Sequence, residues 1–180
     1  NIDRVRHRGV ELQARYRAFE WVELYASYTY DNTEIRDYAR DPALRGKQLP
    51  VTPENRGTVG LVLFLPVDRL YRVPNDSPVD AMELGINANI VGPRYVANDL
   101  ANQLPELPTY GTIDLYGRFE KKLWGLLKLA LFFEIRNVAD TRYSGIAGDR
   151  GFGTVGVNRV GYYPSPGRNF DVGLSVGIAQ

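Results

Sequence analysis

Apolar and polar residues alternate along seven stretches of the chain. In the clearest of them, apolar residues at Val10, Leu12 and Ala14 are separated by the polar residues Glu11 and Gln13. Successive side chains of a β-strand point to opposite faces, so the pattern predicts strands with one aliphatic or aromatic face and one charged face. The predicted strands are residues 3–19, 22–30, 56–65, 82–91, 110–120, 127–137 and 169–178.

The apolar stripes have the length of membrane-spanning strands. Each covers about 9 to 11 residues, which is what a tilted strand needs to cross a bilayer. No stretch of the sequence approaches the roughly 18 uninterrupted apolar residues of a membrane helix. A membrane barrel turns its apolar face to lipid and its charged face to the lumen, whereas a soluble sandwich buries the apolar face. The pattern favours a barrel.

The connections between the predicted strands alternate in length. Long connections gather on one rim of an up-and-down barrel and short turns on the other. The connection at 66–81 is longer than a standard short turn. In chain order the connections are 20–21 (short), 31–55 (long), 66–81 (intermediate), 92–109 (long), 121–126 (short) and 138–168 (longest).

Aromatic residues cluster near both ends of the predicted strands. Such rings prefer the level of the lipid headgroups, so they predict two aromatic girdles. Near the short turns lie Tyr16, Phe19, Trp21, Phe119 and Trp124, and near the long connections lie Tyr28 and Tyr30.

Seven strands do not close in the usual way, because single-chain bacterial barrels have even strand numbers. An open sheet in lipid would leave unpaired amide and carbonyl groups at several kcal/mol each. The sequence therefore predicts part of a larger barrel. A net charge of +1 argues against a nucleic-acid-binding protein, and the absence of cysteine excludes disulfides, thiol catalysis and cysteine metal sites.

Six short motifs follow one another along the chain. They read RGVELQARY at 8–16, VELYASYTY at 22–30, QLPVTPEN at 48–55, TYGTIDLY at 109–116, RNVADTRY at 136–143 and YPSPGRNF at 163–170. In this order they resemble the C-terminal third of the TonB-dependent outer-membrane receptors. The residues that match the two last family motifs are Asn137, Asp140, Tyr143, Pro166, Gly167 and Arg168, while Val138 and Ala139 replace the family's Leu and Phe.

The resemblance implies an all-β, antiparallel, up-and-down transmembrane barrel in the bacterial outer membrane. Residues 1–180 would be the C-terminal portion, about seven strands of a 22-stranded barrel. The family's plug domain and TonB box are not among these residues, so energy coupling is expected outside them. The implied function is TonB-dependent uptake of a metal chelate such as an iron-siderophore, with no enzymatic activity and no cofactor. The implied partners are outer-membrane lipid, the rest of the barrel, the plug domain, the TonB complex and the chelate.

Two sets of residues are candidates for functional contacts. Inward-facing residues would pair with one another or with the plug, or else contact the substrate directly: Glu11, Arg15, Arg17, Glu23, Asp114, Tyr116, Arg118, Glu134 and Arg136. Residues of the long connections would contact an anionic, oxygen-rich chelate, because arginine offers fixed donor forks and tyrosine a flat amphipathic surface. These rim residues are Arg94, Tyr95, Arg150, Arg159 and Tyr162.

Three other signals carry little weight. GFGTVG at 151–156 matches a dinucleotide motif, but no helix can follow it through Gly161 and Pro164. His7, the only histidine, lies four residues before Glu11 in the same predicted strand and so points to the same face. We expect it to be a polar residue of the barrel wall. The acidic residues of the first long connection lack the spacing of a calcium-binding loop.

Two alternatives remain open at the level of sequence. A passive channel or adhesin barrel would lack an upstream plug. A soluble all-β binding domain would cover its aliphatic face with a second layer of structure.

Overall fold

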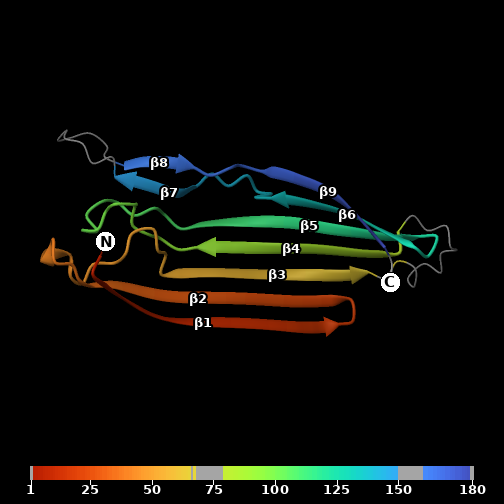
Figure 1. The fold of residues 1–180 in the computed structure, drawn as a ribbon, viewed down its shortest axis with the longest axis horizontal. Helices are drawn as coiled ribbons and strands as arrows, with labels where there is room; N and C mark the ends of the chain where they lie inside the picture. Colours follow the sequence, from red (N-terminus) through yellow and green to blue (C-terminus); the bar gives the residue numbers. More distant parts are fainter. Residues whose placement is uncertain (1, 66, 68–78, 150–159, 179–180) are drawn as a thin grey trace.

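The computed structural model describes residues 2–65, 67, 79–149 and 160–178, and its regular secondary structure is almost entirely β-strand. All seven predicted strands are present (Figure 1). Their bounds are Arg4–Phe19 (β1), Val22–Asp37 (β2), Asn55–Leu65 (β3), Ala81–Val91 (β4), Tyr110–Leu123 (β5), Leu127–Arg136 (β6) and Asn169–Ile178 (β9).

These seven strands form one antiparallel sheet whose spatial order is the order along the chain. β9 pairs with β6, so the sheet reads β1-β2-β3-β4-β5-β6-β9. The register keeps residues of one kind opposite each other across the sheet, as in Leu61 opposite Ile86 and Leu131 opposite Leu174. The up-and-down antiparallel fold predicted from the alternation is confirmed.

Two strands of the structure were not predicted. Ser144–Asp149 (β7) and Val160–Pro164 (β8) pair as a separate two-stranded sheet. Both lie within the longest connection, for which the sequence analysis predicted no strand. These strands are short and β7 contains two glycines, so they carry no clear alternation. A 3-10 turn at Pro42–Leu44 (η1) lies in the first long connection.

Strand β2 runs seven residues further than its apolar stripe. It ends at Asp37, whereas alternation stops at Tyr30. The extra segment pairs with the beginning of β1, for instance Arg6 opposite Glu34. Hydropathy could not show this extension, because a strand that continues into water needs no apolar face.

The apolar face of the sheet is bare. Leu12 is 59% exposed, Leu131 45% and Val172 75%. A soluble domain would need a second layer of structure to cover this face. Within the described residues, no such layer packs on it. The cluster of buried hydrophobic residues is small and lies away from the sheet, among the long connections.

Among the described residues, no helix has the length and hydrophobicity needed to cross a bilayer.

The two kinds of connection lie at opposite ends of the sheet. The β1–β2 and β5–β6 turns share the end where the chain finishes, and the long connections share the end where it starts (Figure 1). Phe19 and Trp21 stack at the first short turn, with ring centroids 5.4 Å apart. The second short turn has left-handed backbone at Trp124 and Gly125, with φ of 51° and 66°. The structure therefore has the two rims that the connection lengths predict.

Candidate functional site

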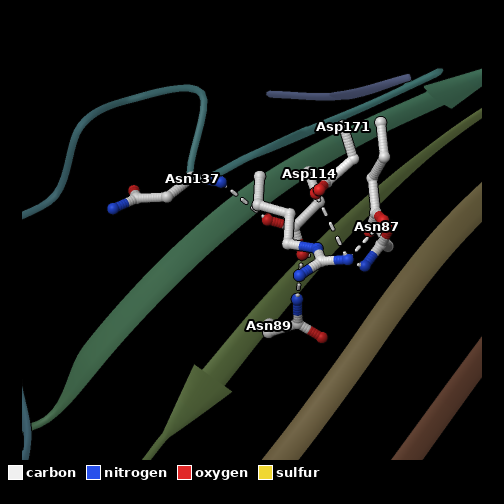
Figure 2. Close-up of polar contacts among 7 residues, drawn as sticks. Asn87, Asn89, Asp114, Asn137 and Asp171 are labelled. Carbon is white, nitrogen blue, oxygen red and sulfur yellow. Dashed lines mark hydrogen bonds and ion pairs between the residues drawn. The ribbon is translucent and has the colours of Figure 1, made fainter. Parts of the chain in front are cut away.

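The polar face of the sheet carries a hydrogen-bonded network centred on Asp114. Its Oδ2 accepts from Asn89 Nδ2 at 2.9 Å and from Asn87 Nδ2 at 3.3 Å (Figure 2). Its Oδ1 accepts the backbone N–H of Asn137 at 2.8 Å. Thr58 Oγ1 extends the network to β3 by donating to Asn89 at 2.9 Å. One carboxylate thus joins β4, β5 and the end of β6.

Ion pairs occupy the same face nearer the short-turn end. Glu23 is 9% exposed and lies 3.4 Å from Arg15 Nη1 and 3.3 Å from Arg17 Nη2. The guanidinium of Arg17 also lies 4.9 Å from the ring centre of Phe64. One carboxylate is therefore shared by two guanidinium groups, which leaves this cluster with a net charge of +1.

The remaining predicted inward residues lie on β1, β5 and β6. Arg118 pairs with Glu120 at 2.8 Å. Arg136 Nη2 lies 2.8 Å from Glu134 and 3.4 Å from Asp171 of β9. Glu11 lies opposite Thr29 and is exposed. These residues share the parity of Asp114 and Glu23, as the alternation predicts.

Aromatic rings on the polar face lie against glycines of the neighbouring strand. Tyr25 covers Gly60 and Tyr116 covers Gly85, and a Cβ added to either glycine would overlap the ring. Phe132 covers Gly173 in the same way. Cross-strand pairing brings each ring to its glycine, which reasoning from single strands did not show.

The family-motif residues close the base of the long connection between β6 and β9. Asn137 Oδ1 accepts the N–H of Thr141, and its Nδ2 donates to the carbonyl of Thr141, both at 2.9 Å. Asp140 Oδ1 accepts the N–H of Arg168 at 2.9 Å. Asn137 and Asp140 both have φ of 52°, a left-handed conformation that Asn and Asp tolerate better than most residues. We call Asn137, Asp140, Gly167 and Arg168 the loop clasp.

Gly167 and Tyr143 complete the base of this connection. A Cβ on Gly167 would lie 2.6 Å from Asp140 Oδ1, so any larger residue would displace this carboxylate. Tyr143 stacks on Tyr110, with centroids 4.0 Å apart. Pro166 precedes the glycine and is exposed. The motif residues hold the two ends of the connection together.

Arg94 fastens the β7–β8 hairpin to the neighbouring loop. It is 4% exposed, and its Nη2 donates to the carbonyl of Ser144 at 2.8 Å while its Nε donates to that of Gly145 at 3.2 Å. Its guanidinium also lies 5.2 Å from the ring centre of Tyr110. Arg94 was predicted to face a ligand on the rim, but here its guanidinium faces protein.

A small hydrophobic core joins the same two segments. Val96 and Leu107 from the loop pack with Ala147 and Val160 from the hairpin. A parallel bridge between Ala97 and Gly148 runs alongside.

The first long connection is tied to the second. Gln48 N–H donates to Asn102 Oδ1 at 2.7 Å, and Asn102 Nδ2 returns a bond to the carbonyl of Gln48 at 3.1 Å. Val51 N–H donates to the carbonyl of Tyr95 at 2.9 Å. We call the described parts of 38–54, 92–109 and 137–168 the loop assembly. Sequence reasoning missed it, although asparagine at left-handed positions such as Asn102 (φ 53°) is a signal of ordered loops.

The other rim candidates have different positions. Burial and then the carboxylate of Glu106 raise the pKa of Tyr95. Tyr162 is exposed and lines a hollow of about 660 Å³ with Asn98, Ile146 and Tyr163. Arg150, Arg159 and the GFGTVG segment lie outside the described residues. Ligand binding by the rim residues stays a prediction.

Charged residues of β1 pair with charged residues at the end of β2. His7 Nδ1 lies 3.1 Å from Asp31, and Glu34 contacts Arg6 and Arg36. In the part of the chain that the structure describes, no three acidic or histidine side chains are grouped to hold a metal.

Comparison with known proteins identifies the fold family. The family model described as TonB dependent receptor-like, beta-barrel, matches residues 1–138. The ferrioxamine B receptor of Salmonella typhimurium (strain LT2) is 28% identical over 145 residues, which are 79% of this chain and 18% of the receptor. The chain therefore spans about a fifth of the length of this curated relative.

Solved structures of similar fold come from the same class. BauA, the ferric preacinetobactin receptor of Acinetobacter baumannii, aligns with a TM-score of 0.70 at 17% identity, covering 96% of this chain and 22% of that one. The ferric citrate transporter FecA gives 0.66 at 21% identity, covering 96% and 24%. The ferric yersiniabactin uptake receptor FyuA of Yersinia pestis gives 0.62 at 19% identity, covering 96% and 23%.

These matches confirm the predicted outer-membrane location and the prediction that the chain is not an enzyme, because the matching family is that of the TonB-dependent receptors and the relatives are named as receptors and transporters. They also agree with a sheet that is apolar on one side and polar on the other. This chain belongs to the TonB-dependent receptor family and forms part of its β-barrel.

Proposed function

We propose that this chain supplies the C-terminal wall strands and outer loops of a receptor that takes up iron chelates through the outer membrane. The observation that carries the proposal is the loop assembly, which stands at one rim of a sheet with a bare apolar face and a hydrogen-bonded polar face. The names of the relatives support the substrate class, since they bind or transport ferrioxamine B, ferric citrate and ferric yersiniabactin.

In this proposal the two faces have separate tasks. The apolar face contacts acyl chains, and the polar face lines the bore and contacts the plug. Glu23 and Glu134 already pair with arginines, so these two carboxylates are compensated before a chelate passes. TonB, acting on the plug outside these residues, would open the path.

Capture of the chelate is assigned to the rim. The hollow beside Tyr162 offers an aromatic surface next to the amide of Asn98. Tyr95, Arg150 and Arg159 are further proposed contacts, because guanidinium and phenol groups suit an anionic, oxygen-rich chelate. Arg94 would support the hairpin that carries Tyr162.

The test is uptake of ⁵⁵Fe by the full-length receptor, produced in a bacterial host that lacks its own ferric-chelate receptors. Hydroxamate, citrate and catecholate chelates are supplied one at a time, with and without TonB. We expect TonB-dependent uptake of at least one chelate. Normal membrane insertion without uptake of any iron chelate would overturn the substrate class, and equal uptake without TonB would favour the passive channel.

The Tyr162→Ala variant tests the hollow. We expect binding of the transported chelate to weaken by about 10-fold, the loss typical of an aromatic contact worth more than 1 kcal/mol. Tyr38→Ala is the control, because Tyr38 lies on the first long connection and does not line the hollow. Binding that is equal for both variants and the wild type would remove Tyr162 from the proposed site.

A further inference from the structure

The hollow of about 660 Å³ beside Tyr162 is lined both by the β7–β8 hairpin and by the loop that precedes β5. The hairpin stands at the long-connection end of the sheet (Figure 1). The volume is within the range of small-molecule sites, which is about 300 to 1,000 Å³. The wall includes the exposed side chains of Ile146, Tyr162 and Tyr163 from the hairpin, together with Asn98 from the loop. The hollow is therefore large enough for a small ligand, and its side chains are mostly apolar or aromatic.

The described residues that line the hollow are uncharged. Arg94 is the only basic residue of the loop at 92–109, and its buried guanidinium already binds backbone carbonyls at the hairpin. Asp99 follows Asn98 in the chain, and its carboxylate accepts two backbone N–H groups of the same loop and forms no ion pair among the described residues. Moving an anion into such surroundings costs free energy, because no described cation replaces its hydration. The described part of the hollow therefore disfavours an anionic ligand.

Gly148 leaves one side of the hollow open. It lies in β7 and lines the hollow, and a Cβ added to it would meet no atom within 4 Å. Its backbone is not in the left-handed region. Neither packing within the described residues nor backbone conformation therefore requires a glycine here, and a larger side chain at this position would occupy the hollow without a clash.

We propose that the hollow binds the carbon frame of an uncharged ferric chelate of the trihydroxamate class. Three singly charged hydroxamates balance Fe³⁺, whereas three doubly charged catecholates leave a strongly anionic complex. The methylene chains of a trihydroxamate can pack against Ile146 and the tyrosine rings, and the amide of Asn98 can donate to its carbonyl oxygens. This inference rests on the proposed function and narrows its substrate class.

The experiment measures binding of chelates to the full-length receptor in a neutral detergent. A ferric trihydroxamate, a ferric tris-catecholate and ferric citrate, each labelled with ⁵⁵Fe, are titrated separately. We expect the trihydroxamate to bind about 10-fold more tightly than either anionic chelate, because only the anions must lose hydration without a compensating cation. An anionic chelate that binds as tightly as the trihydroxamate would overturn the inference and leave the proposed function intact. Binding of none of the three would overturn both.

A size series at Gly148 tests whether the chelate occupies the hollow. Gly148→Leu fills the space and should weaken trihydroxamate binding by at least about 10-fold, whereas Gly148→Ala adds one methyl group and should change it less than about 3-fold. Wild-type affinity in Gly148→Leu would mean that the chelate binds elsewhere.

A charge introduced at Ile146 tests the selectivity. Ile146→Lys places an ammonium in the hollow and should raise the affinity for the tris-catecholate relative to the trihydroxamate by about 5-fold. Ala39→Lys is the matched control, because Ala39 is exposed on the first long connection and does not line the hollow. Misfolding would weaken all three chelates, so a gain for the tris-catecholate in Ile146→Lys alone supports the proposal. No gain, or the same gain in Ala39→Lys, would overturn it.

Discussion

At the scale of single residues, the loop clasp depends on the absence of a Cβ at Gly167. Gly167 leaves room for the carboxylate of Asp140, which binds the N–H of Arg168. The sequence showed that these residues match a family motif. It could not show why, because the reason is a contact between residues 28 positions apart.

Gly167→Ala should open the clasp. The new Cβ would lie 2.6 Å from Asp140 Oδ1, so the carboxylate must move and its bond to Arg168 weakens. We expect local opening of the clasp to become easier by about 1 kcal/mol, the net value of one hydrogen bond. Amide exchange of Arg168 in the full-length receptor measures this. Gly177→Ala is the control, because nothing lies within 4 Å of a Cβ there; equal exchange in both variants would contradict the prediction.

Asp80 gives a pH dependence at the short-turn end. The backbone N–H of Lys122 at 2.6 Å and the ammonium of Lys121 at 2.9 Å lower the pKa of this carboxyl. A lowered folded-state pKa stabilises the fold above the unfolded value of about 4, and this contribution disappears as pH falls through the folded value. Asp80→Asn should therefore be less stable than the wild type at pH 6, and the difference should become smaller in acid, as the pH falls through the lowered folded-state pKa of Asp80. Urea unfolding of the full-length receptor at pH 6 and in acid tests this; a difference that stays as large in acid would count against it.

At the scale of elements, alternation predicted the strands inside the membrane and missed those outside it. A bilayer requires one apolar face over a fixed length, so β1 to β6 and β9 carry a pattern. The β7–β8 hairpin meets no such requirement. Its stability comes from Arg94 and from a core shared with a loop about 50 residues earlier, which no local pattern records.

Arg94→Lys should loosen the hairpin. A lysine can satisfy one carbonyl, but it lacks the fork that serves Ser144 and Gly145 together and the flat surface over Tyr110. Losing one charged hydrogen bond costs about 1.5 to 3 kcal/mol, so amide exchange in β7 and β8 should rise by about 10- to 150-fold. Amides of β3 and β4 should keep their wild-type rates.

The control for this experiment is Arg45→Lys. Arg45 is exposed in the first long connection and makes no ion pair among the described residues. If hairpin exchange is unchanged in Arg94→Lys, or if Arg45→Lys raises it equally, Arg94 does not anchor the hairpin.

At the scale of the whole molecule, the alternation predicted which side chains share a face of the sheet, but it did not predict how the loops at the rim contact one another. Parity alone placed Asp114, Glu23 and Arg136 on one face and Leu131 on the other, and the structure agrees. Ligand contact by Arg94 stays a prediction, but the structure shows that its guanidinium already binds the carbonyls of Ser144 and Gly145. Composition indicates which residues suit a ligand and not which of them bind neighbouring loops. The Asn102–Gln48 pair was missed for the same reason, since it joins connections 54 residues apart.

The orientation of the sheet has a direct energetic test. Leu131 is 45% exposed on the apolar face, whereas Glu134 lies on the polar face beside Arg136. If acyl chains cover the first and water or plug the second, Leu131→Arg should cost about 2 to 4 kcal/mol near the bilayer midplane. Glu134→Gln should cost less than about 1 kcal/mol, because it removes one half of a partly exposed ion pair. Urea unfolding of the full-length receptor in phospholipid vesicles measures both, and equal costs at the two positions would mean that lipid does not cover the apolar face.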